Sequence, residues 1–197
     1  MSTSEETYLI TGIGGLGVRT VDEINSRNPS LCRFAVCDTD DRTLACSGVK
    51  DKHLLTESTL LWRVVQGADT VILTAVLGGA TGDRYAPAIC RKAKEHGAKV
   101  FAMVATSPRE EDADRAESAL SKLRKELRSS LWVIDSQKLS QCYDPQPIPS
   151  RLIQILLNNL AENVRLMAED RIKTDSAIKN IIHHIDVLKS SLQEDGE

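Results

Sequence analysis

"LGGATGDR", Leu77 to Arg84, and "GIGGLG", Gly12 to Gly17, are the two stretches that decide the fold of this 197-residue chain. Each follows an apolar run of strand length and precedes a segment of helical period. Glycines between a strand and a helix bring backbone N–H groups together at the positive end of the helix, where a phosphate can approach closely. The sequence therefore predicts two loops that bind one polyphosphate.

Apolar runs alternate with helical segments along most of the chain, which is typical of βα units around a mainly parallel sheet. We expect strands at "YLIT", "RFAVCD", "TVILTAV", "KVFAMVA" and "LWVID". Between them we expect helices over 18–27, 58–67 and 110–128, and one that begins near Pro87 and stops at Gly97. The predicted fold class is α/β, in three layers with Rossmann-like topology.

The chain divides into three predicted parts: an α/β domain over 1–148, a long central helix over 149–172 packed on it, and an amphipathic C-terminal helix over 173–197. In the last part, isoleucines and leucines recur at spacings of three and four, which is the pattern of a narrow helical seam. Such a seam needs a partner. We expect it to join a second copy or a partner protein, or to fold back onto the central helix.

Composition excludes several classes of protein. Aromatic residues make up 4% of the chain and the net charge is −3, which argues against nucleic-acid binding. The five cysteines are odd in number and include no CxxC pair, so neither a disulfide framework nor a zinc site is indicated, and we expect reduced, mostly buried thiols. No apolar stretch is long enough to span a bilayer, and we expect a cytoplasmic protein.

The first glycine cluster alone fits a dinucleotide site. "GIGGLG" matches G-x-G-x-x-G, and Asp38 ends the next strand, where such folds keep a ribose-binding acid. An NAD(P)-binding protein or enzyme is therefore one interpretation. It does not explain "GGATGDR", which also lacks the Gly-Lys-Ser/Thr ending of a Walker loop.

Taken in order, the motifs resemble the tubulin and FtsZ family over roughly residues 7 to 170. In that family a GxGGxG loop, a strand ending in Asn-Thr-Asp and a signature loop GGGTGTG or GGGTGSG surround a guanine nucleotide. Here "AVCDTDDRTL" is similar to the second strand, with Asp38 where asparagine is usual and then Thr39 and Asp40. "GGATGDRYAPAICRKAKEHG" is similar to the signature loop and its helix.

The resemblance extends to the ribose and base contacts. "VATSPREEDADR" looks like the loop whose acidic residue and arginine flank the ribose, matched by Glu111 and Arg115. Asn158 and Asn159 lie near the base-recognition pair of the family's central helix. From the residues alone, Glu111 and Arg115 also fit a solvated pair at helical spacing, and Asp38 and Asp40 also fit turn formation.

By resemblance, the chain is a minimal nucleotide-binding protein for GTP or GDP, with or without Mg²⁺, which assembles or binds a partner. The implied nucleotide-binding residues are Gly12, Gly14, Gly15, Leu16, Gly17, Arg19, Asp38, Asp40, Gly78, Gly79, Ala80, Thr81, Gly82, Glu111, Arg115, Asn158 and Asn159.

The chain also departs from the family pattern. We expect the family's second domain and its acidic catalytic loop to be missing here, and therefore little or no hydrolysis, and we name no catalytic residue. Arg19 stands where the family has a base-contacting asparagine, and Ser136 replaces another. Asp83 begins the signature helix, where a carboxylate about 4 Å from a phosphate is repelled by roughly 1 kcal/mol in water. Compensation by Mg²⁺, or by Arg84 and Arg19, is one interpretation, and a scaffold that binds no ligand is the other.

Overall fold

The computed structural model of the chain describes residues 7–27, 29–30, 32–141, 154–159 and 163. The strands in this part are β1 (Tyr8–Ile13), β2 (Arg33–Asp38), β3 (Asp51–Leu54), β4 (Thr70–Leu77), β5 (Lys99–Thr106) and β6 (Leu131–Ile134). The helices are α1 (Gly14–Arg27), α2 (Asp41–Ala45), α3 (Trp62–Val65), α4 (Ala80–Glu95), α5 (Ala113–Leu127) and α6 (Ser136–Gln141), with short 3-10 turns η1 (Glu110–Asp112) and η2 (Arg128–Ser130).

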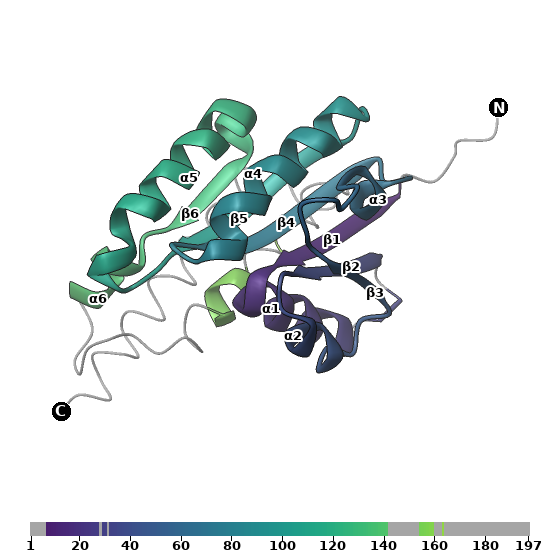
Figure 1. Cartoon of the computed structure of the whole chain (residues 1–197), viewed down its shortest axis with the longest axis horizontal. Coiled ribbons are helices and arrows are strands. Elements are labelled where there is room, and N and C mark those ends of the chain that lie inside the picture. Colours follow the sequence, from purple (N-terminus) through teal and green to yellow (C-terminus); the bar gives the residue numbers. More distant parts are fainter. Residues whose placement is uncertain (1–6, 28, 31, 142–153, 160–162, 164–197) are drawn as a thin grey trace.

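The strands form one parallel sheet in the order β3-β2-β1-β4-β5-β6. The chain builds outward from β1 to β3, returns to the middle, and builds outward on the other side from β4 to β6 (Figure 1). The strand order therefore reverses between β1 and β4. In sheets of this kind, ligands bind at the carboxyl ends of the two strands that flank the reversal.

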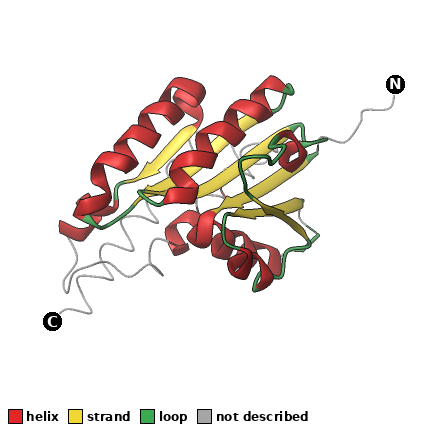
Figure 2. Ribbon diagram, viewed as in Figure 1, coloured by secondary structure: helices red, strands yellow, loops and turns green. Residues whose placement is uncertain are grey.

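Helices cover both faces of the sheet (Figure 2), as right-handed crossovers between parallel strands require. One face packs against α3, α4 and α5, and the other against α1, α2 and residues 154–159. The three-layer α/β architecture predicted from the sequence is confirmed.

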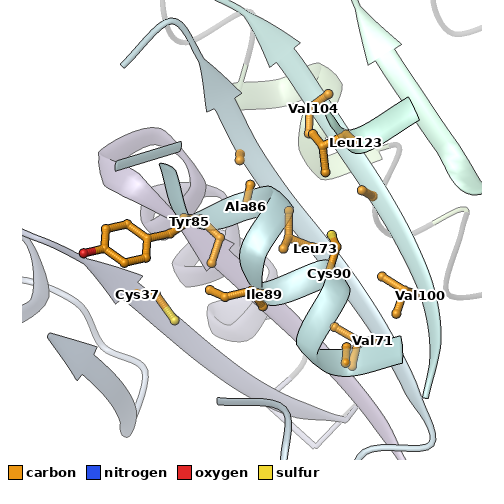
Figure 3. Close-up of a cluster of buried hydrophobic side chains, with 14 of the residues drawn as sticks. Cys37, Val71, Leu73, Tyr85, Ala86, Ile89, Cys90, Val100, Val104 and Leu123 are labelled. Atoms are coloured by element: carbon orange, nitrogen blue, oxygen red, sulfur yellow. The ribbon is translucent and has the colours of Figure 1, made fainter. Parts of the chain in front are cut away.

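The core on the α4 side includes two buried cysteines, Cys37 and Cys90 (Figure 3). Burial raises the pKa of each thiol to about 12, because the interior disfavours the thiolate. Both residues therefore stay protonated at physiological pH. Of the thiols expected to be mostly buried, Cys37 and Cys90 are buried, Cys32 is half-buried and Cys46 is exposed, and Cys142 lies outside the described residues.

Two elements of the first half were not predicted. The edge strand β3 has the sequence "DKHL", in which polar side chains dominate, and its residues alternate between half-buried and exposed. Edge strands carry such polar sequences because only one side of the backbone is paired. The short helix α2 is initiated by Asp40, whose side chain accepts a hydrogen bond from the N–H of Arg42.

The predicted start of the helix after the signature loop is wrong. α4 begins at Ala80, directly after the glycines, and continues through Pro87, whose side chain is buried. Proline lacks the N–H that would bond to the carbonyl four residues back, but the surrounding core tolerates this loss. The helix expected over 58–67 is also shorter, since α3 spans only Trp62–Val65 and Leu60 is exposed.

Residues 154–159 are helical and contact the α1 side of the sheet. Leu156 and Leu157 are buried there, and the amide of Gln154 donates to the carbonyl of Arg19 and to the carboxylate of Glu23. Asn163 is also helical, and the rest of the predicted central helix and the predicted C-terminal helix lie outside the described residues. Among the residues described, no helix has the length and apolar character needed to cross a membrane.

Candidate functional site

The two glycine loops lie next to each other at one edge of the sheet. β1 and β4 are paired neighbours, and α1 and α4 start directly after their carboxyl ends (Figure 1). A cavity of about 270 Å³ opens between them. Its lining consists of Ile13, Gly14, Gly15, Leu16, Val76, Gly79, Ala80, Thr81, Gly82, Ser107, Pro108, Arg109 and Asp112.

Three of the loop glycines are required by packing of backbone against backbone. A Cβ atom on Gly12 would lie 2.2 Å from the carbonyl oxygen of Gly17, and one on Gly17 would lie 2.7 Å from the carbonyl oxygen of Thr74. A Cβ atom on Gly82 would lie 2.2 Å from the carbonyl oxygen of Val76. These glycines let each helix start pressed against its strand, and they need no ligand to explain them.

Two further glycines have positive φ angles. Gly14 has φ +74° at the start of α1, and Gly78 has φ +102° at the end of β4, a region that side-chain-bearing residues rarely adopt. A Cβ atom on Gly78 would also lie 2.7 Å from Cβ of Ser107. Both glycines are therefore explained by the turns that they make.

Gly15 and Gly79 are different. A Cβ atom on either would meet no protein atom within 4 Å, and neither has a positive φ. Both residues are exposed and both line the cavity. The described part of the protein thus places no steric or conformational demand for glycine at these two positions, and the space that side chains would fill belongs to the cavity.

The cavity favours an anion. The first N–H groups of an α-helix have no partner within the helix, and two helices direct such groups toward one space here. Gly79, the N-cap of α4, provides no side-chain hydrogen bond to these groups. The side chain of Arg109 contributes a third source of positive charge to the lining.

The loop after β5 forms the third wall. Asp112 is buried, and its carboxylate accepts from the hydroxyl of Ser107 at 2.7 Å and from the guanidinium of Arg115. The hydrogen bond from Ser107 and then the one from Arg115 hold the pKa of Asp112 below its usual value. The carboxylate therefore stays ionised and hydrogen-bonded beside the cavity.

Searches among known proteins return relatives of one kind. FtsZ 2 of Halobacterium salinarum is 29% identical over 185 residues, which are 82% of this chain and 47% of that protein. The solved structure of an empty FtsZ dimer from Methanocaldococcus jannaschii superposes with a TM-score of 0.74 at 19% identity, covering 84% of this chain and 56% of that one. The GTPγS-bound protofilament of CetZ2 from Haloferax volcanii gives a TM-score of 0.59 at 14% identity, over 88% and 62%.

The chain is similar to FtsZ proteins in sequence and has the fold of the tubulin/FtsZ nucleotide-binding domain. The resemblance of the glycine loops is thus part of a similarity that covers most of the chain in sequence and in fold. No protein-family model matches it. The chain spans about half the length of the curated FtsZ relatives it matches.

Of the residues that the family resemblance implies, the structure brings one group together around the cavity. That group is Gly14, Gly15, Leu16, Gly79, Ala80, Thr81 and Gly82. The other implied residues do not line the cavity: Gly12, Gly17, Arg19, Asp38, Asp40, Gly78, Glu111, Arg115, Asn158 and Asn159.

The residues at the end of β2 contact Thr81 of the signature loop through hydrogen bonds. Asp38 is buried, and its carboxylate accepts from the N–H groups of Thr39 and Asp40 and from the hydroxyl of Thr81 at 3.3 Å. The hydroxyls of Thr39 and Thr81 are 2.7 Å apart. One carboxylate oxygen of Asp38, Oδ1, therefore accepts all of these bonds from the protein itself.

The remaining implied residues have varied surroundings. Arg19 lies exposed on α1, and Glu111 lies exposed with its carboxylate 3.6 Å from the guanidinium of Arg109. Asn158 is buried, and neither its amide nitrogen nor its amide oxygen has a hydrogen-bond partner among the residues that the structure describes. The carbonyl of Asn159 accepts from the side chain of Asn163. The unpartnered amide of Asn158 is the type of group that a bound base could satisfy.

Asp83 does not close the cavity. Its carboxylate accepts from the N–H of Gly78 at 2.7 Å and lines a neighbouring cleft of about 490 Å³ between α4 and α5. Burial raises the pKa of Asp83, and the bond from Gly78 opposes that rise. Arg84 extends away to an exposed ion pair with Glu57. The expected competition between Asp83 and a bound phosphate is reduced, because the carboxylate turns toward the other side of the loop.

Sequence reasoning placed the loop after β5 at the site but named Glu111 and Arg115, and it missed the lining residues Ser107, Pro108, Arg109 and Asp112. A signal was present, because these residues directly follow the strand beside β4 and so reach the same edge of the sheet. Within the part of the chain that the structure describes, no group of three or more His, Cys, Asp or Glu side chains could hold a metal ion.

Proposed function

We propose that this chain binds GTP or GDP with the nucleotide phosphates in the cavity between the starts of α1 and α4. The observation that carries the proposal is the pair Gly15 and Gly79, which leave room that no atom of the described residues uses. Glycine at these positions is explained if a ligand approaches the backbone closely. The other loop glycines would be needed in an empty scaffold as well.

The size and charge of the cavity support phosphate rather than the whole nucleotide as its occupant. Sites that enclose a drug-sized ligand measure roughly 300–1,000 Å³. The 270 Å³ measured here suits a phosphate chain, with sugar and base extending beyond it. Because a nucleotide brings its own phosphate oxygens, Mg²⁺ would need few protein ligands.

Guanine is favoured by the relatives. The CetZ2 protofilament holds GTPγS, and the curated relatives are FtsZ proteins. The unpartnered amide of Asn158 offers both a donor and an acceptor, as recognition of a base edge requires. An NAD(P) site receives support from the strand order, but Asp38 is buried and its Oδ1 already accepts from Thr39, Asp40 and Thr81.

We further propose that hydrolysis by the isolated chain is slow. Among the described residues, Asp112 is the one carboxylate that lines the cavity. Its oxygens accept from Ser107 and Arg115, and its pKa lies below the ordinary value. Such a carboxylate is a poor general base at neutral pH. Phosphate release measured on the nucleotide-bound chain would refute this if it showed many turnovers per minute.

The ligand is tested by identifying what the protein binds. Mass spectrometry of the small molecules released on denaturing freshly purified protein is expected to show GDP or GTP. Calorimetric titration with GTP, GDP, ATP and NAD⁺ in the presence of Mg²⁺ is expected to show binding of the two guanine nucleotides only. Binding of NAD⁺ alone, or of none of the four, would overturn the proposal.

The site is tested by Gly79→Val. The backbone there is extended (φ −105°, ψ 154°), which suits a β-branched residue, and the side chain would enter open space. We expect an unchanged circular dichroism spectrum and loss of guanine-nucleotide binding. A folded Gly79→Val variant that binds as tightly as the wild type would place the phosphates elsewhere.

We also propose that the chain assembles with itself or with a partner protein through the predicted helix over 173–197. Its spacing of apolar residues supports this, and the solved relatives include a dimer and a protofilament. Light scattering after size-exclusion chromatography, with and without residues 174–197, tests it. An unchanged oligomeric mass after the deletion would exclude that segment as the cause of self-assembly.

A further inference from the structure

Gly78, the first glycine of the signature loop, is held at both of its backbone polar groups by side chains. Its N–H donates to the carboxylate of Asp83 at 2.7 Å, and its carbonyl accepts from the guanidinium of Arg115 at 2.8 Å. Asp83 comes from the first turn of α4, and Arg115 comes from the first turn of α5. Two helices therefore fix one residue of the loop.

The arrangement continues into the third wall of the cavity. Arg115 also donates to Asp112, Asp112 accepts from Ser107, and the N–H of Ser107 donates to the carbonyl of Leu77 at 2.7 Å. These hydrogen bonds therefore form a continuous series from the carbonyl of Gly78 to the carbonyl of Leu77, the preceding residue. They tie the signature loop to the loop after β5, and residues of both loops line the cavity.

The cross-link fixes the backbone directly before the start of α4. Gly78 is buried in a left-handed conformation, and the residues that follow it carry the first N–H groups of α4. A rotation about Gly78 would redirect those groups. A loop that is fixed before the ligand arrives does not lose conformational entropy when the ligand binds.

We propose that Asp83 and Arg115 are positioning residues that hold Gly78 and thereby keep the phosphate-binding loop in its competent conformation in the absence of nucleotide. The role rests on the proposed nucleotide binding. It differs from a direct contact of Arg115 with the ribose, because Nη2 of the guanidinium bonds to Gly78 and Asp112 rather than to a ligand. It also explains why a charged residue stands at position 83, since the carboxylate bonds to the loop from the cleft side.

Kinetics of nucleotide binding separate positioning from contact. If only a fraction of the molecules has a competent loop, the apparent affinity falls by that fraction, and the loss appears in the association rate. Removal of a direct contact instead speeds dissociation. We expect Asp83→Ala and Arg115→Ala to slow association of a fluorescent GDP analogue about tenfold in stopped-flow measurements, with dissociation unchanged.

Conservative variants and neighbours provide the controls. Asp83→Asn keeps an oxygen acceptor for the N–H of Gly78 and is expected to associate at least as fast as the wild type. Asp114→Ala and Arg84→Ala remove charges that line the same cleft without contacting Gly78, and they are expected to leave both rates unchanged. Faster dissociation of Arg115→Ala with normal association would show direct contact and overturn the positioning role.

Hydrogen exchange tests the clamp without any nucleotide. We expect the amide of Gly78 to be protected in the nucleotide-free wild type and in Asp83→Asn, and to exchange at least tenfold faster in Asp83→Ala, as followed by NMR. Equal exchange in wild type and Asp83→Ala would overturn the proposal. If the wild type binds no guanine nucleotide, the proposed function fails even where Gly78 is protected, so the two failures are distinguishable.

Discussion

Replacing Gly15 with alanine should make the nucleotide-free chain more stable and weaken its binding of guanine nucleotide. Gly15 lies in the first turn of α1, has no positive φ, and has no atom within 4 Å of the position of an added Cβ. The fold therefore accepts the methyl group without strain. The cavity does not, because that methyl group occupies the space assigned to a phosphate.

Both magnitudes can be estimated. A glycine-to-alanine change that the native backbone accepts stabilises a protein by about 0.4–1 kcal/mol, chiefly by restricting the unfolded chain. For a chain of this length, such a gain raises the Tm by about 1–4 °C. Loss of one hydrogen bond to a charged phosphate costs roughly 1.5–3 kcal/mol, which is about 10- to 100-fold in Kd.

The assays are thermal denaturation of the nucleotide-free protein and calorimetric titration with GDP. Gly48→Ala is the matched control, since Gly48 is exposed, lies outside the cavity lining and has its nearest neighbouring atom 4.0 Å from the position of an added methyl group. Gly48→Ala is expected to leave the Kd unchanged. A Gly15→Ala variant that is stable and binds GDP with the wild-type Kd would refute the assignment of Gly15 to the phosphate site.

Three further outcomes are expected. Gly82→Ala should destabilise the chain by about 3 kcal/mol in urea denaturation, because its methyl group would lie 2.2 Å from the carbonyl of Val76, and a wild-type midpoint would contradict the packing described. Gln154→Ala should cost about 2 kcal/mol by removing its bonds to α1, and no loss of stability would mean that residues 154–159 are not docked there. Asp83→Asn should be more stable than the wild type at pH 7. Burial raises the pKa of Asp83 above its unfolded value, so the wild type regains stability as the pH falls through the raised pKa. The advantage of the variant, measured in urea, should therefore shrink as the pH is lowered into the acid range. An advantage independent of pH would argue against an ionised, partly buried Asp83.

The sheet was predictable because its strands are apolar on both faces. The segment "RFAVCD" is a strand with the predicted bounds, and "TVILTAV" is lengthened by a single residue, Leu77. β3 escaped prediction because a polar edge strand has no such pattern. The predicted start of α4 is wrong because a proline such as Pro87 usually suits the first turn of a helix, whereas the glycine loop allows this helix to begin seven residues earlier.

The candidate site was predictable in position but not in the role of each residue. Sequence alone treats all loop glycines alike, whereas Gly12 and Gly82 are required by contacts with other backbone segments and Gly15 by none. Similarly, the spacing of Arg115 cannot show that its guanidinium reaches the carbonyl of Gly78, 37 residues away in the sequence. Such distinctions depend on which segments the fold brings together.

The rate at which the buried thiol of Cys90 is alkylated would report how often the core opens. Cys90 has no exposed surface and its thiol has a pKa of about 12, so an alkylating reagent reaches a reactive sulfur only when α4 lifts from the sheet or the domain unfolds. Exposed Cys46 would react at once and serve as the internal reference. The ratio of the two labelling rates would thus measure, under native conditions and without denaturant, how often the helix that follows the signature loop detaches.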